Sequence, residues 1–181
     1  MIGWVNSLRQ SQSGAAAAEL ALSLPLMLIL LFGSVEAGNY FYSEHKLVES
    51  VRDGARWASR QNFSDYPCTG SIDAGTADDI EEVIRTGRVG GSDDRLPLMD
   101  NADDGGTATY SITYICTNQM ETKPGSGSYV PVGGLYNNMG QAPIVTVDVQ
   151  VPYQSLFGFE YGFPAGGIWL NAEQQTTVNG V

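Results

Sequence analysis

The sequence is poor in the residue types on which most metal sites and nucleic-acid interfaces depend. It has one histidine and two cysteines, and only 9 lysines and arginines against 20 acidic residues, for a net charge of −11. A zinc site of the common Cys/His type needs about four ligands at short spacings, and no such cluster is present. Because a chain with this much negative charge repels phosphate backbones, we expect no nucleic-acid partner.

Recognisable catalytic motifs are also missing. The chain has no glycine-rich phosphate loop with its lysine and no Gly-x-Ser-x-Gly motif. The single histidine, His45, has no serine or cysteine partner in its sequence context, and we interpret it as a solvated or interface residue rather than a catalytic or pH-sensing one. The sequence therefore predicts a protein that is not an enzyme and that needs no cofactor.

An acidic stretch between Gly90 and Gly106 is the one candidate for a metal loop. It does not fit an EF-hand, because with Gly105 at the sixth place Ala102 and Ser111 occupy places that need ligands, the last a carboxylate. A looser calcium site stays open, but a solvated acidic loop is the favoured interpretation, and no metal ligands are assigned.

What the sequence does contain is a long apolar run near its start. Residues 15–35 read AAAAELALSLPLMLILLFGSV, with Glu19 as the only charge. A helix of this length extends about 32 Å, close to the hydrocarbon thickness of a bilayer, and membrane helices tolerate a proline such as Pro25. Arg9 precedes the run and an acidic chain follows it, which places the N-terminus in the cytoplasm and the rest outside.

Glu19 is unexpected in such a segment, because a carboxylate near the centre of a bilayer costs about 2.5 kcal/mol or more. The simpler interpretation is that Glu19 is a charge tolerated at the edge of the span. The functional one is a carboxylate that meets a cation within the membrane. The free amine of a neighbouring chain would be such a cation if the chain were cut before Ala15.

The residues around this point carry a resemblance. A short polar leader ending in Gly14, then four alanines and Glu19 at the start of an apolar helix, resembles a type IV prepilin signal. The wider segment is similar to the TadE-like family, the minor pseudopilins of Tad (tight adherence, Flp) pilus systems. Further matching features are Pro25, Gly33, Glu36, the stretch Arg52–Arg56 and a Val-Pro-Tyr strand end at Tyr153. Leu20 departs from the family, whose members more often have an aromatic residue there.

This resemblance implies a mechanism and a set of partners. Prepilin peptidase would cut between Gly14 and Ala15, and Glu19, then fifth in the mature chain, would pair with the N-terminal amine of an adjacent subunit. The expected protein is a minor pseudopilin acting in assembly of a Tad-type type IV pilus, which serves adhesion and surface attachment. Its partners would be the peptidase, other pilin or pseudopilin subunits, the inner-membrane assembly platform and membrane lipid.

Three alternatives remain at this point. Residues 35–37 have the small-x-small pattern of a signal peptidase site, which would release a secreted protein. The apolar run would otherwise be an uncleaved single-pass anchor. In either case the function would be that of an acidic binding module unrelated to pili. A type II secretion pseudopilin is a nearer variant of the first interpretation.

The fold expected is α+β and pilin-like, with a long N-terminal helix packed on a small antiparallel sheet. We expect a cytoplasmic leader at 1–14, a transmembrane helix at 15–36 in a bacterial inner membrane, a helical extension at 37–61 and an extracytoplasmic domain at 62–181. Apolar residues at spacings of three, four and seven predict that the helix runs from about Ala15 to about Arg60.

The domain is expected to contain one more helix and three strands. A capping box at 76–79 predicts a helix over about 77–88, ended by Gly87 or Gly90. Alternating apolar residues predict strands over 107–117, 144–153 and 167–178. The connections 118–143 and 154–166 are long, and the alternating aromatics Phe157, Phe159, Tyr161 and Phe163 form either a subunit contact or part of the core.

The two cysteines, Cys68 and Cys116, both fall in the predicted exterior domain. An oxidising compartment favours a disulfide between them, which would close a loop and stabilise the fold by about 4 kcal/mol in the chain-entropy model. Two buried free thiols are the alternative.

Overall fold

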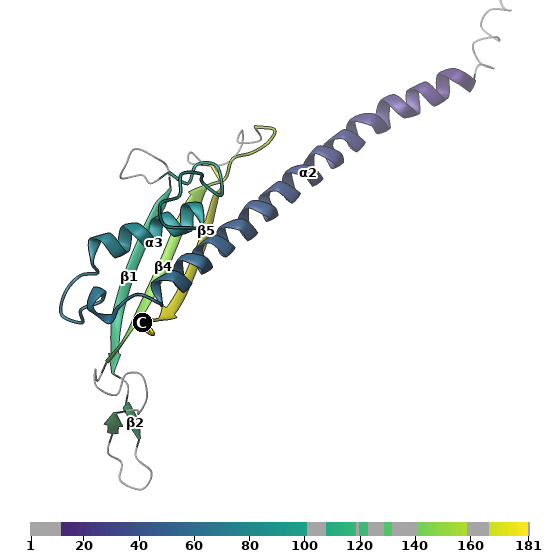
Figure 1. The fold of residues 1–181 in the computed structure, drawn as a ribbon. Coiled ribbons are helices and arrows are strands. Elements are labelled where there is room, and N and C mark those ends of the chain that lie inside the picture. The colour runs from purple at the N-terminus through teal and green to yellow at the C-terminus, as the bar shows by residue number, and fades with distance from the viewer. Residues whose placement is uncertain are drawn as a thin grey trace, which may run out of the picture.

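The computed structural model describes residues 12–100, 108–118, 120–122, 129–131, 141–158 and 167–180. It consists of one long helix whose second half packs, with a shorter helix, on a three-stranded antiparallel sheet (Figure 1). The α+β class predicted from the sequence is confirmed.

Helix α2 spans Gln12–Ala58 and includes Pro25 without ending there. At 1.5 Å per residue its length is about 70 Å, and its N-terminal half projects away from the rest of the protein (Figure 1). The predicted single helix is therefore present. The helix continues without a break through residues 36 and 37. The expected boundary between membrane span and helical extension is therefore not a change in secondary structure, and that the helix leaves the membrane there stays a prediction.

Helix α3 spans Ala74–Thr86 and begins three residues before the predicted start. Asp73 is its N-cap, because the Asp73 carboxylate accepts a hydrogen bond from the Thr76 amide at 3.1 Å. The predicted capping box at 76–79 was therefore wrong, since Thr76 is already inside the helix. Gly87 ends α3 in the left-handed conformation, with φ 91°, as one of the two expected C-caps.

The main sheet has the order β1-β4-β5, with both neighbouring pairs antiparallel. Strand β1 spans Thr109–Asn118, β4 spans Gln141–Pro152 and β5 spans Trp169–Thr177. These are the three predicted strands. Alternate residues of β4 are fully buried, namely Val145, Val147, Val149 and Val151, because one face of the sheet carries the helices.

A second sheet was not predicted. Strands β2 (Met120–Thr122) and β3 (Tyr129–Pro131) pair antiparallel within the stretch that we expected to be a plain connection. They lie at the end of the body away from the projecting half of α2 (Figure 1).

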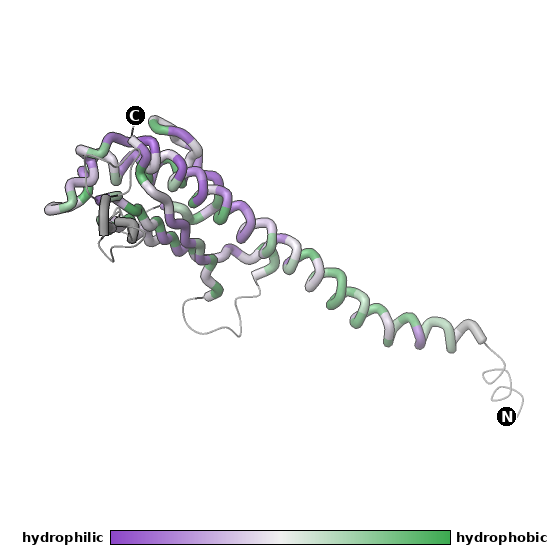
Figure 2. Tube along the Cα trace, turned by 90° about the horizontal axis from the view of Figure 1, so that it is seen from below, coloured by the Kyte–Doolittle hydropathy of each residue, from purple (hydrophilic) through white to green (hydrophobic). Residues whose placement is uncertain are grey.

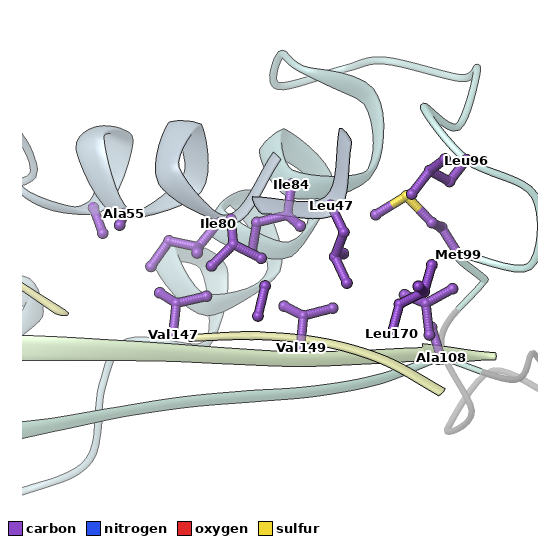
Figure 3. Close-up of a cluster of buried hydrophobic side chains, with 14 of the residues drawn as sticks. Leu47, Ala55, Ile80, Ile84, Leu96, Met99, Ala108, Val147, Val149 and Leu170 are labelled. Carbon is purple, nitrogen blue, oxygen red and sulfur yellow. The ribbon is translucent and has the colours of Figure 1, made fainter. Parts of the chain in front are cut away.

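The core lies between the two helices and one face of the sheet (Figure 3). Helix α2 contributes a stripe of buried residues at helical spacing, Leu47, Val51, Ala55 and Ala58. Helix α3 contributes Ile80, Val83 and Ile84. These side chains meet the valines of β4, so the second half of α2 is an integral part of the body.

A disulfide joins Cys68 to Cys116, as predicted. It fixes the loop before α3 to the end of β1 that lies furthest from the projecting half of α2. The Tyr114 hydroxyl strengthens the same junction, since it donates to the carbonyl oxygens of Pro67 and Gly70. The alternative of two free thiols is therefore excluded in this fold.

Candidate functional site

The N-terminal half of α2 is an apolar surface that the protein itself leaves uncovered. The large apolar side chains are exposed from Leu20 (59%) to Phe32 (39%). An 18-residue window of this helix has a mean hydropathy of 2.2 and none of it is buried, and the apolar half stands out along the trace (Figure 2). This helix is thus long and apolar enough to cross a membrane.

Gly14 and Ala15 lie in the first turn of α2, and both are exposed. A Cβ atom added at Gly14 would meet no atom within 4 Å. The fold therefore has no need of glycine at this position, and any requirement for it must come from another molecule.

Glu19 is exposed one turn after Ala15. No ion pair to Glu19 is formed by the residues that the structure describes. In a bilayer such a carboxylate would lie near the start of the span, where it needs either water or a cation from another molecule. The roles predicted for Gly14, Ala15 and Glu19 stay predictions.

The point where α2 meets the body contains a hydrogen-bond cluster that sequence reasoning missed. The Tyr153 hydroxyl donates to Glu36 Oε1 at 2.8 Å, and the Leu156 amide donates to Glu36 Oε2 at 3.2 Å. Asn39 Nδ2 donates to the Tyr153 hydroxyl oxygen at 2.8 Å. We call these four residues the neck. Both carboxylate oxygens of Glu36 are thus used to hold the chain that follows β4.

The Tyr153 side chain is only 8% exposed. Desolvation by burial, and then the Glu36 carboxylate, raise the pKa of its hydroxyl, so it stays a donor at neutral pH. Its ring also packs edge-to-face on Tyr40, with the ring centroids 5.3 Å apart. The charge-assisted hydrogen bonds of the neck are therefore supported by an aromatic contact with the adjacent Tyr40.

An apolar groove adjoins the neck. It has a volume of about 870 Å³ and is lined mainly by the side chains Leu28, Ile29, Phe32, Tyr40, Phe41 and Ile168. We call it the neck groove. It lies between the end of the apolar half of α2 and the chain segments that flank the start of β5 and the end of β4, so it opens where a membrane span would leave the bilayer.

The other charged candidates are structural or solvated in the described residues. His45 is exposed and lies 3.3 Å from Glu49, one turn along α2. In the acidic stretch, Arg85 binds Asp94 at 3.1 Å and Asp100 at 3.2 Å, which ties the loop to α3. Within the described ranges, no group of three metal-ligating side chains is close enough to hold an ion. Asp103 and Asp104 lie outside the described residues, as do Phe159, Tyr161 and Phe163.

A comparison with known families matches the part of α2 just described, from Gly14 through the apolar half and Glu36. Residues 14–56 match the TadE-like protein family. The match begins at Gly14 and ends at Arg56, so it covers the apolar half of α2, the neck residues of α2 and most of its buried stripe. Comparison with curated proteins and with solved structures gives no match.

The TadE-like match confirms the resemblance seen in the sequence and implies a protein associated with a Tad pilus system. It also implies that its partners belong to that system. Tyr153 lies outside the matched segment, yet the structure places it against Glu36, which is inside. The two features were recognised separately in the sequence, and their contact was not foreseen.

Proposed function

We propose that this protein is a minor pseudopilin, anchored in a bacterial inner membrane by the N-terminal half of α2 and acting in assembly of a Tad pilus. In this proposal prepilin peptidase cuts the precursor between Gly14 and Ala15. The matured helix then packs among pilin or pseudopilin helices on the membrane assembly platform, while the acidic domain remains outside the cytoplasm.

The observation that supports this proposal most strongly is the exposed apolar half of α2, which starts at Gly14 and falls within the TadE-like match. A soluble protein would bury so many large apolar side chains. The alternative of a secreted domain cut near residue 37 would remove Glu36 and so destroy the neck. The structure therefore favours retention of the apolar half of α2 over its removal.

Glu19 is assigned the pairing role in this mechanism. After cleavage the Ala15 amine of one subunit would be a cation at the depth of the Glu19 carboxylate of its neighbour. Such a pair is worth more in a low-dielectric setting than in water. It would select a helix register between subunits, because an unpaired carboxylate in the span is costly.

The experiment compares Gly14→Ala with Gly38→Ala. Both glycines are in α2, and at both a Cβ atom would meet nothing within 4 Å, so neither change should disturb the fold. In cells that contain the matching peptidase, Gly14→Ala should leave the precursor uncut and Gly38→Ala should be processed as the unaltered chain is. The readout is the size of the membrane-bound protein. Normal processing of the Gly14 variant would contradict the proposal.

A further inference from the structure

The segment that follows β4 presents two exposed apolar side chains at the level of the predicted span. Leu156 is 59% exposed and Phe157 is 44% exposed. The Phe157 ring packs edge-to-face on Phe32 of α2, with the centroids 5.1 Å apart. Glu36 holds the Leu156 backbone amide, so this position beside α2 is fixed by the neck. We call residues 154–158 the neck loop.

The contact with Phe32 fixes the depth of the neck loop. Phe32 precedes Glu36 by four residues, so it lies about 6 Å further along the helix axis towards the N-terminus. If Glu36 marks the polar boundary of the span, Phe157 lies on the hydrocarbon side of that boundary. Apolar residues of interfacial segments reach about 5–10 Å into the headgroup and acyl boundary, which is the depth found here.

The chemistry of the neck loop fits a lipid surface. Its five residues, Gln-Ser-Leu-Phe-Gly, carry no charge, and burying them in a membrane interface therefore needs no desolvation of an ion. Tyr40 and Phe41 lie about one turn beyond Glu36 on α2, where the span would meet the headgroups, and aromatic residues are enriched at membrane interfaces. Phe157 also contacts Phe32, which lines the neck groove together with Leu28 and Ile29 of the span itself.

We propose that the neck loop is a second membrane contact, in which Leu156 and Phe157 insert among the phospholipid acyl chains of the leaflet that α2 leaves, with acyl chains also occupying the neck groove. This inference rests on the membrane anchoring in the proposed function, and it adds an orienting device to it. A single helix leaves the body free to tilt and turn on its axis. A second contact at one side of that helix holds the body in one orientation relative to the bilayer.

Photolabelling of the full chain tests this directly. The purified protein is placed at one chain per nanodisc in phosphatidylethanolamine and phosphatidylglycerol, with a phospholipid that carries a diazirine on its acyl chain. After illumination, mass spectrometry locates the adducts. We expect adducts in the apolar half of α2 and in the neck loop. We expect none at Ile115, which is 64% exposed but pairs with Ile144, about nine residues or about 30 Å along the sheet from Tyr153 of the neck.

The possible results separate the two claims. Labelling of α2 without the neck loop overturns this inference and leaves the span in place. Absence of labelling from α2 overturns both the span and the inference. Neck-loop labelling that disappears when discs hold several chains identifies a second copy as the occupant and overturns the lipid assignment. Processing at Gly14 is measured separately, so a failure here is not mistaken for a failure of the pseudopilin proposal.

A reporter variant gives an independent measurement. Phe157→Trp keeps an aromatic ring against Phe32, and Ile115→Trp places the same reporter at the far end of the sheet. In discs with acyl-brominated phospholipid, the added fluorescence of the first variant should be quenched and that of the second should not. Equal quenching of the two variants, or none in either, would contradict the inference.

Discussion

At the scale of single residues, the neck shows how two distant positions become one site. Glu36 ends the apolar half of α2 and Tyr153 follows β4, 117 residues later. Each could be marked from the sequence as a family feature. Their contact could not, because it depends on the direction of β4 relative to α2 and on how far the strand extends. These are properties of the packed sheet, which no local pattern encodes.

Removal of the Tyr153 hydroxyl should loosen the neck. Tyr153→Phe keeps the ring on Tyr40 but leaves Glu36 Oε1 without its donor. Since hydrogen bonds to charged groups contribute about 1.5–3 kcal/mol, we expect a lower free energy of unfolding by about 1.5 kcal/mol, measured by thermal unfolding in detergent micelles. The control is Tyr42→Phe, whose side chain is 63% exposed. Equal melting temperatures for the two variants would refute the role given to the neck.

Replacement of Glu19 should separate insertion from assembly. Glu19→Ala removes a charge from the span, which makes insertion easier by up to about 2.5 kcal/mol, so the protein should still reach the membrane. Pilus output should fall, because the amine of the neighbouring subunit loses its partner. Glu49→Ala, on the same helix but beyond the span, is the control. The pairing role is wrong if surface pili are as abundant with Glu19→Ala as with Glu49→Ala.

At the scale of elements, local signals determined what could be predicted. The apolar run and the helical spacing of Leu47, Val51 and Ala55 predicted α2. The alternation of apolar and polar residues predicted the three long strands. The start of α3 was misplaced because Asp73 and Thr76 are both good N-caps, and packing selects between them. Strands β2 and β3 were missed because three residues are too few to show a period.

The contact between α2 and α3 explains one glycine in the TadE-like segment. A Cβ atom at Gly54 would clash with Ile84 Cγ1 and lie 3.0 Å from its Cδ1, so glycine lets the two helices approach closely. Gly54→Ala should therefore destabilise the body by about 1–3 kcal/mol through overpacking. Gly38→Ala in the same helix should be neutral, or stabilising by up to about 1 kcal/mol. Denaturant unfolding in micelles measures both, and a neutral Gly54 variant would count against this packing.

At the scale of the whole molecule, the protein has two ends with different surroundings. The neck, the neck groove and the neck loop lie where the apolar half of α2 joins the body. The disulfide joins Cys68 to Cys116 at the opposite end, and strands β2 and β3 lie at that end too (Figure 1). The open face of the sheet between them is mostly polar, with Thr113, Asp148 and Gln175 among its residues. This arrangement suits a body that is held at a membrane by one end and presents the other outward.

The N-terminus of the mature protein is the most direct test of the central claim. Intact mass measurement of the protein extracted from its native membrane should give a chain that begins at Ala15, as prepilin-type processing requires. A mass corresponding to the uncut chain would make α2 a plain anchor and leave Glu19 without its partner. A chain that begins at Gly38 would mean that the apolar half of α2 is discarded, and either result would contradict the pseudopilin account.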